Sequence, residues 1–244
     1  IHSREENKWE LNLEEIMKHI KDAKAIYINT PNNPTGWMMN SQEQMQILEL
    51  CRKEKIWIIS DAVYERITYD RKVAPSFLDI SNEDDMLIVV NSFSKSWAMT
   101  GWRLGWMIVP EGLIRIFEKL NEFNVASPSS PVQHAGVTAI REGESFIEQM
   151  MHDLRISRKI TLDNLNTFSR VIFPISEAAF YAYFKIKDVT DSEKFCFETL
   201  NSTGVGLAPG TSFGNGGENW VRICYAKSPE LLNQAFEKLK PVFT

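Results

Sequence analysis

Short apolar runs alternate with longer helical patterns along the first part of the chain, and this alternation constrains the fold more than any other feature. Between the first two runs lies Ser41–Glu54, where apolar residues recur at helical spacing and Ser41 and Gln44 have the spacing of a capping box. Strand, helix and strand in this order are typical of a parallel sheet with helices on its faces. The runs that predict buried strands are Ala25–Asn29, Ile56–Ser60, Met86–Asn91 and Gly105–Val109.

The second part of the chain has a different pattern, in which one long helix is followed by fewer and more widely spaced strands. We therefore expect an α/β fold with a mostly parallel sheet and flanking helices over residues 1–145, and a smaller α+β domain over residues 146–244. The elements predicted there are a helix at about Glu144–Phe168, a strand at Ala179–Ile186, a helix near Asp191–Leu200, a strand at Trp220–Tyr225 and a last helix with Ser228 as its N-cap.

Composition excludes several classes of function. The formal net charge is −5, so the sequence offers no basic surface for nucleic acid or an anionic membrane, and its apolar stretches are too short to cross a bilayer. The three cysteines and four histidines are scattered without the spacing of a metal site, so we expect no metal. An odd number of widely spaced cysteines favours buried thiols in the reducing cytoplasm, where we expect the protein to lie.

Three polar clusters each follow a predicted strand. Because ligands bind at the carboxyl ends of parallel strands, we expect the three clusters to meet at one crevice. Each residue alone has a simpler explanation, as a turn, a helix cap, a surface lysine or an ion pair. Their order along the chain favours a shared site instead, and a lysine among small and apolar residues suits imine formation. The clusters are Thr30–Gly36, Asp61–Tyr64 and Ser92–Lys95, with Arg103 beyond the last.

These clusters carry a family resemblance that extends over essentially the whole chain. The sequence resembles the class I, fold-type I aminotransferases that depend on pyridoxal 5'-phosphate, particularly the aspartate aminotransferase-like group. The motifs that carry the resemblance, in family order, are TPNNPTG (30–36), SDAVYERITYD (60–70), NSFSKSWAMTGWRLGW (91–106), LAPGTSFG (207–214) and NWVRICYA (219–226).

The resemblance implies catalytic roles for three residues. Lys95 would hold pyridoxal phosphate as a Schiff base, and its freed amine would act as the general base. Asp61 would pair with the protonated pyridine nitrogen and keep the ring an electron sink. Tyr64, together with Asn33, would donate to the phenolic oxygen of the cofactor.

The resemblance also assigns the residues that bind the two anionic groups. Ser92 and Arg103 would hold the cofactor phosphate, since a guanidinium suits the geometry of that group. Arg222 would bind the α-carboxylate of the substrate, with Asn33 beside it. An ion pair at a domain interface is the structural alternative for Arg222.

The family's segment before TPNNPTG is long, and it supplies a phosphate loop, an aromatic residue on the pyridine ring and an arm on the dimer partner. None of these is found in the first 24 residues, where the sequence predicts a polar lead-in at Ser3–Asn12 and a helix at Leu13–Lys21. We therefore expect that the N-terminal part is missing, and that this polypeptide alone is inactive or weakly active.

The function expected from the resemblance is transfer of an amino group between an α-amino acid and a 2-oxo acid, by a homodimer in the full-length form. Two alternatives stay open: a related pyridoxal phosphate lyase or decarboxylase, and an effector-binding, aminotransferase-like domain of a regulator. The same lysine, aspartate and arginine would serve elimination or decarboxylation. Which amino acid is the substrate is not readable from the sequence.

Overall fold

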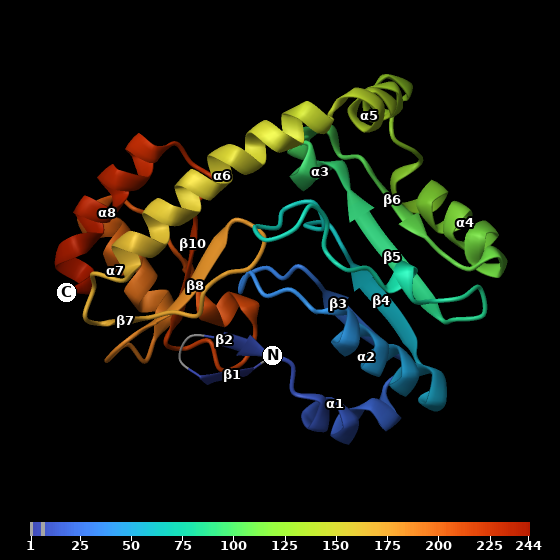
Figure 1. Cartoon of the computed structure of the whole chain (residues 1–244), viewed down its shortest axis with the longest axis horizontal. Helices are drawn as coiled ribbons and strands as arrows, with labels where there is room; N and C mark the ends of the chain where they lie inside the picture. Colours follow the sequence, from blue (N-terminus) through green and yellow to red (C-terminus); the bar gives the residue numbers. More distant parts are fainter. Residues whose placement is uncertain (1, 6–7) are drawn as a thin grey trace. The chain divides into compact units, whose positions relative to one another are not determined.

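The computed structural model describes residues 2–5 and 8–244, which form two compact units (Figure 1). One unit comprises Leu11–Pro31 and Met38–Gln149. The other comprises the described residues up to Glu10 together with Asn32–Trp37 and Met150–Thr244. Residues 32–37 therefore belong to the same unit as the C-terminal part of the chain, although in the sequence they come between β3 and β4 of the other unit.

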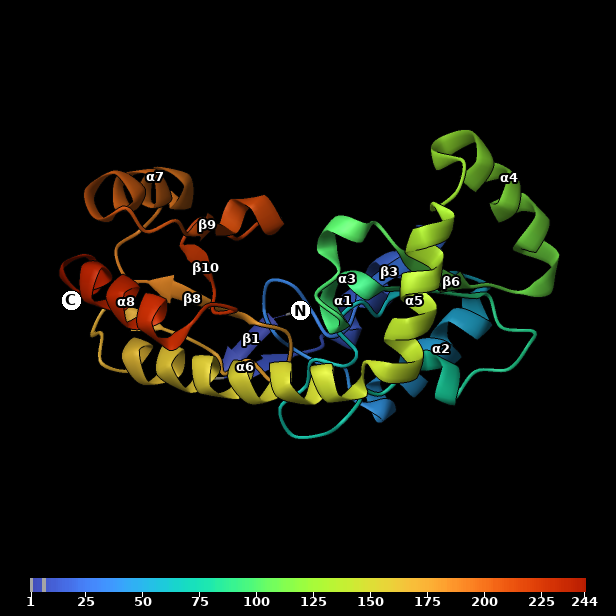
Figure 2. The ribbon, with the colours of Figure 1, turned by 90° about the horizontal axis from the view of Figure 1, so that it is seen from above.

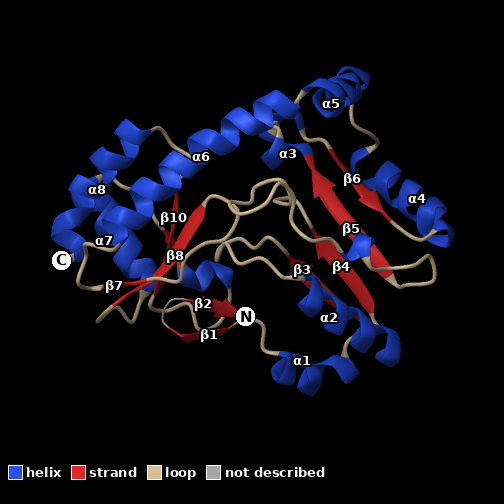
Figure 3. Ribbon diagram, viewed as in Figure 1, coloured by secondary structure: helices blue, strands red, loops and turns tan. Residues whose placement is uncertain are grey.

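The lysine-containing unit, Leu11–Pro31 with Met38–Gln149, is built on a sheet of four strands in the order β3-β4-β5-β6. Figure 3 shows β5 of this sheet with β4 and β6 beside it. The pairs β3·β4 and β4·β5 are parallel and β5·β6 is antiparallel, as expected for a mostly parallel sheet. Its elements are α1 (Leu13–His19), β3 (Ala25–Asn29), α2 (Ser41–Glu54), β4 (Trp57–Asp61), β5 (Leu87–Ser92), α3 (Phe93–Ser96), β6 (Gly105–Ile108), α4 (Ile114–Val125) and α5 (Ser130–Glu142).

The predicted positions of these strands are confirmed to within one residue. The bounds of β3 are those expected, whereas β4 and β5 each begin and end one residue later, so Asp61 and Ser92 are the last residues of their strands. Burial alternates along β4 and β5, with Ile58 and Val89 buried and their neighbours half-buried. The prediction of buried strands is therefore wrong in part, because only every second residue of β4 and β5 is buried and most residues of β3 and β6 are half-buried or exposed.

Helix α2 has the predicted bounds, but a different residue caps it. Asn40 is the N-cap: its side chain accepts from the Glu43 backbone N–H at 2.9 Å, and the Glu43 carboxylate accepts from the Asn40 N–H at 2.8 Å. The predicted capping box of Ser41 and Gln44 is wrong. Gln44 is instead buried and donates to the Pro75 carbonyl at 2.9 Å, because asparagine one residue earlier already satisfies the first turn.

The arginine-containing unit carries the second four-stranded sheet, in the order β7-β8-β10-β9. Figure 2 shows α6, α7 and α8 beside β8 and β10. Ser228 caps α8 as predicted, and the buried face of α8 is Leu232, Phe236, Leu239 and Phe243. The elements are β1 (His2–Glu5), β2 (Lys8–Glu10), β7 (Val171–Ile172), β8 (Tyr181–Ile186), α7 (Ser192–Thr203), β9 (Ala208–Pro209), β10 (Trp220–Cys224) and α8 (Pro229–Phe243), and α6 (Glu144–Leu165) contains the boundary between the units.

Several described elements were not predicted from the sequence, among them the hairpin β1–β2, the short strands β7 and β9, and helix α5. The expected polar lead-in at Ser3–Asn12 contains the hairpin β1–β2, and Trp9 of that hairpin is 7% exposed, with its ring 4.9 Å from that of Trp220. Helix α5 follows the Pro-rich break at residues 127–131, where Ser129 is its N-cap. A single aromatic residue among charged neighbours gives no strand periodicity, which is why the hairpin was missed.

Candidate active site

Asp61 ends β4 between two parallel neighbours, in register with Asn29 of β3 and Val90 of β5. Its carboxylate accepts two hydrogen bonds from neutral donors. The Val63 backbone N–H donates to Oδ1 at 3.2 Å, and the Tyr27 hydroxyl donates to Oδ2. Two neutral donors orient a carboxylate without neutralising its charge, so Asp61 presents an anion at the carboxyl edge of the sheet.

Lys95 lies one strand further along the same edge, on the short helix α3. Ser92 caps this helix by accepting from the Ser94 backbone N–H at 3.0 Å. The Lys95 ammonium nitrogen lies 5.6 Å from the centroid of the Tyr64 ring, and Tyr64 is only 3% exposed. The lysine itself is half-buried. The structure therefore brings Lys95 and Tyr64 together, as the motif order predicted.

An aromatic cluster anchors the helix that carries Lys95. The Phe93 ring lies 5.0 Å from that of Trp97 and 5.1 Å from that of Trp106, and Phe93 is buried. Burial of such large rings dominates local packing energy, so it can hold a four-residue helix that has little stability of its own. The helix that carries Lys95 is thus held in place by the packing of Phe93 against the two tryptophan rings.

The antiparallel pairing of β5 with β6 places Ser92 opposite Gly105, two residues after Arg103. The Ser92 hydroxyl donates to the carbonyl of Leu104, the residue after Arg103, at 3.3 Å. Arg103 is exposed in the left-handed backbone region at φ 53°, and its guanidinium donates to the Thr100 carbonyl at 3.0 Å. A hydroxyl and a guanidinium are donors suited to an anionic group.

The turn at residues 32–36 belongs to the other unit, where Asn32, the residue before Asn-Pro-Thr-Gly, maintains the turn. The Asn32 side-chain oxygen accepts from the Thr35 hydroxyl at 2.7 Å and from its N–H at 3.2 Å. Gly36 has φ +68°, and its carbonyl accepts from the backbone N–H groups of Glu177 and Ala178, each at 2.9 Å. This leaves the side chain of Asn33 for a different contact.

Asn33 contacts Arg222, which is 189 residues away in the sequence. The Arg222 Nη1 donates to Asn33 Oδ1 at 2.7 Å. The guanidinium carbon of Arg222 lies 4.4 Å from the Tyr181 ring centroid and 4.8 Å from that of Phe213. Its Nε is buried and makes no hydrogen bond. Two aromatic faces and an amide fix the plane of the guanidinium, which is the arrangement that favours bidentate binding of a carboxylate.

The site residues thus fall into two groups, one in each compact unit. Asp61, Tyr64, Ser92, Lys95 and Arg103 share the carboxyl edge of the β3–β6 sheet, whereas Asn33 and Arg222 share a contact in the other unit. Sequence reasoning missed three side chains in contact with these groups, Tyr27, Tyr181 and Phe213. The only signal for Tyr27 was its i, i+2 spacing from Asn29, which places both on one face of a strand.

A cavity lies in the lysine-containing unit, away from the side chains of the candidate site. It has a volume of about 360 Å³ and is lined by residues at the amino-terminal ends of β4 and β5, including Arg52 and Asp85. The Arg52 and Asp85 side chains pair with each other at 2.6 and 2.7 Å. This cavity therefore surrounds a structural ion pair, at the opposite end of the strands from Lys95.

Two kinds of feature are absent from residues 2–5 and 8–244. None of the described helices is long and apolar enough to cross a membrane. Over the same residues, no group of three or more His, Cys, Asp or Glu side chains is arranged to hold a metal ion.

Comparison with known proteins places the whole arrangement in one family. The family model described as aminotransferase class I and II matches residues 1–239. The chain is 34% identical over 243 residues to an aspartate aminotransferase of Pyrococcus abyssi, and 32% identical to aromatic-amino-acid aminotransferase 2 of Thermococcus litoralis. Each alignment covers 98% of this chain and 62% of the relative, so the chain spans about three fifths of their length.

Solved structures agree with the sequence comparison. The aromatic aminotransferase of Pyrococcus horikoshii matches with a TM-score of 0.89 and 32% identity, over 96% of this chain and 63% of that one. The aspartate aminotransferase of Thermotoga maritima matches with a TM-score of 0.86 and 31% identity, over 95% of this chain and 60% of that one. With the motifs, the fold and these relatives in agreement, the chain belongs to the class I and II aminotransferase family.

Proposed function

We propose that this chain carries the catalytic lysine and the substrate-binding arginine of an aminotransferase that moves an amino group between an α-amino acid and a 2-oxo acid. The family to which it belongs depends on pyridoxal phosphate. The observation that carries the proposal is the placement of Lys95 beside Tyr64, one strand from the Asp61 carboxylate. We further propose that the lysine-containing unit is the cofactor-binding part and the arginine-containing unit the small domain.

The donor set of the lysine-containing unit fits the chemical groups of pyridoxal phosphate. Lys95 offers an amine for the aldehyde, and Asp61 offers an anion for the pyridine nitrogen. The Ser92 hydroxyl and the Arg103 guanidinium offer donors for the phosphate, and Tyr64 a phenol for the ring oxygen. When bound, the cofactor supplies a ring that withdraws electrons from the substrate α-carbon.

The chain's own groups would then divide the work as follows. The Lys95 amine takes the proton from the α-carbon of the substrate and returns it to the product, as a general base and acid. Asp61 keeps the pyridine nitrogen protonated through its negative charge. Arg222 binds the α-carboxylate, and its contact with Asn33 fixes the direction of its N–H groups.

The experiment that tests this function maps the covalent attachment of the cofactor. The full-length protein is incubated with pyridoxal phosphate, reduced with borohydride and digested, and the labelled peptide is identified by mass spectrometry. We expect the label on Lys95, and loss of the label in Lys95→Met. Lys72→Met is the matched control, since Lys72 is a surface lysine paired with Glu144 at 3.0 Å. Label on another lysine in the parent protein would contradict the proposal.

Substrate binding by Arg222 has a separate test in the full-length protein. Arg222→Met keeps the length of the side chain but removes its charge, so the KM for amino acids should rise by about 100-fold or more, in line with a lost charged hydrogen bond of roughly 3 kcal/mol. An unchanged KM would show that Arg222 serves only as a structural contact to Asn33.

The products identify the type of reaction. Transamination forms a 2-oxo acid without free ammonia, whereas elimination releases ammonia and decarboxylation releases carbon dioxide. The relatives at 30–35% identity carry the names aspartate, aromatic-amino-acid and LL-diaminopimelate aminotransferase, so these three substrate classes are the first to compare. If ammonia is the main product, the reaction is an elimination and the proposal of transamination is wrong.

We also propose a homodimer and a cytoplasmic location for the full-length protein. All three cysteines are free, which supports a reducing compartment. Helix α4 leaves Leu120 and Phe123 57% and 91% exposed, which supports coverage by another surface. Analytical ultracentrifugation of the full-length protein would decide its oligomeric state, and fractionation of cells its location.

A further inference from the structure

Tyr27 makes an unexpected contact at the candidate cofactor site. It lies in the middle of β3, two residues before Asn29, and 63% of its surface is exposed. Despite this exposure its hydroxyl donates to Oδ2 of Asp61 on the neighbouring strand. Tyr27 is in register with Ile59, so its side chain reaches diagonally across two residues to the end of β4. A phenylalanine at this position would keep the ring and lose the contact.

The Asp61 carboxylate has room for a third partner. Ionised, it offers about four acceptor positions on two oxygens. Val63 and Tyr27 occupy one position on each oxygen. The Asn29 side chain does not compete for these positions, because it donates to the backbone carbonyl of Asp61 at 3.1 Å. A protonated ring nitrogen can therefore bind Asp61 while Tyr27 stays in place.

We propose that Tyr27 is a positioning residue for the cofactor: its hydroxyl orients the Asp61 carboxylate and withdraws part of its negative charge, and so sets how strongly Asp61 binds the pyridine nitrogen. The inference deepens the proposed function and rests on it. Partial burial and the contact with Asp61 raise the pKa of the Tyr27 phenol well above its ordinary value, so the phenol keeps its proton at neutral pH and remains a donor.

The expected effect follows from the loss of one donor to a carboxylate. Without the phenol, more of the negative charge of Asp61 acts on the ring, and this stabilises the protonated form of the bound cofactor. The pH midpoint of the cofactor's visible absorbance should therefore rise in Tyr27→Phe. A shift of about 0.5 to 1 pH unit is expected, which is a three- to tenfold change in proton affinity.

The first measurement uses the full-length protein loaded with pyridoxal phosphate. The absorbance band is titrated with pH in the parent protein, in Tyr27→Phe and in Tyr69→Phe, a half-buried tyrosine of the same unit that is outside the candidate site. We expect the midpoint to rise in Tyr27→Phe only. A midpoint unchanged in Tyr27→Phe, or moved equally in both variants, would overturn the inference, and a merely structural role for Tyr27 would give the first of these results.

The second measurement needs no cofactor. Tyrosines labelled with ¹³C at Cζ are titrated by NMR, with Tyr27→Phe identifying the Tyr27 signal. We expect the Tyr27 phenol to titrate at lower pH in Asp61→Asn than in the parent protein, because the negative charge that disfavours the phenolate is gone. The same midpoint in both proteins would overturn the inference.

The two proposals fail in different ways. If borohydride reduction labels Lys95 in every variant while the absorbance midpoint stays fixed, the inference about Tyr27 fails and the proposed function stands. If Lys95 is never labelled, the proposed function fails, and the inference fails with it, because it concerns the binding of that cofactor.

Discussion

Gly36 in the Asn-Pro-Thr-Gly turn allows a quantitative test of the structure. Its backbone has φ +68°, in the left-handed region, and its carbonyl lies against the segment at residues 176–178. A Cβ added at this position would lie 2.5 Å from the Cβ of Ser176 and 2.8 Å from the carbonyl oxygen of Ala178. The substitution Gly36→Ala therefore meets both an unfavourable backbone conformation and an occupied space.

The two effects add to a measurable loss of stability. The left-handed conformation costs an alanine about 1–2 kcal/mol, and crowding in a packed site costs about 1–3 kcal/mol more. We expect Gly36→Ala to lower the free energy of unfolding by about 2–5 kcal/mol. Gly204→Ala separates the two costs, because Gly204 has φ +73° with no atom within 4 Å of an added Cβ. It should lose only about 1–2 kcal/mol.

The assay is urea unfolding of the full chain, followed by tryptophan fluorescence. The double variant Gly36→Ala with Ser176→Gly removes one of the two close contacts, and a double-mutant cycle with the single variants should show a favourable coupling between the sites. If Gly36→Ala costs no more than Gly204→Ala, the reasoning from the packing of this turn is refuted.

Two further predictions concern the ion pair of Arg52 with Asp85 and the buried side chain of Trp9. Arg52 lowers the pKa of Asp85 below its ordinary 3.8, so their pairing stabilises the folded state above that pH and is lost as the pH falls through the lowered pKa. Urea unfolding at a series of pH values should therefore show Asp85→Asn to be less stable at neutral pH, with the gap closing in acid; a gap independent of pH would contradict this. Trp9→Ala should cost about 3–5 kcal/mol on urea unfolding, because Trp9 is 7% exposed, whereas Trp102→Ala, at a residue 49% exposed, should cost clearly less. Equal losses would show that the Trp9 hairpin does not support the fold.

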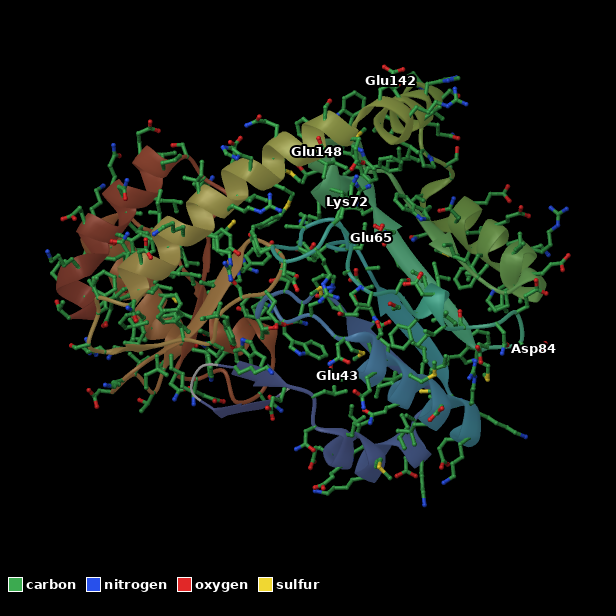
Figure 4. The ribbon with its side chains drawn as sticks, viewed as in Figure 1. Glu43, Glu65, Lys72, Asp84, Glu142 and Glu148 are labelled. Atoms are coloured by element: carbon green, nitrogen blue, oxygen red, sulfur yellow. The ribbon has the colours of Figure 1, made fainter. Side chains whose placement is uncertain are left out.

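Glu65 and Lys72, both labelled in Figure 4, have surroundings that the neighbouring sequence does not predict. Glu65 follows Tyr64 directly in the sequence, yet burial raises the pKa of its carboxyl while a hydrogen bond from Asn91 opposes the rise. Lys72 pairs with Glu144, 72 residues further on in the sequence. Neither environment follows from the residues beside it in the chain, because both depend on which strands and helices the fold brings together.

The sequence by itself determined the features that local periodicity and strand ends encode. It placed β3 and α2 with the observed bounds, and it put Asp61 and Ser92 at the ends of neighbouring strands. Helical periodicity and the change from apolar to polar residues at a strand end involve neighbours in the chain, so both are visible in the sequence, whereas the N-cap Asn40 and the alternating burial of β4 were not predicted. The motifs that carry the family resemblance are likewise short segments of consecutive residues, so they could be recognised in the sequence.

Only the tertiary structure decided which distant side chains meet. The contact of Asn33 with Arg222, the hydroxyl of Tyr27 on Asp61 and the burial of Trp9 join residues that share no local pattern. Such contacts depend on strand register and on side-chain length, and a shift of one residue in register would turn Arg222, Tyr27 or Trp9 to the opposite face of its sheet. For this reason the chemistry of the candidate site was readable from the sequence, while the groups that orient it were not.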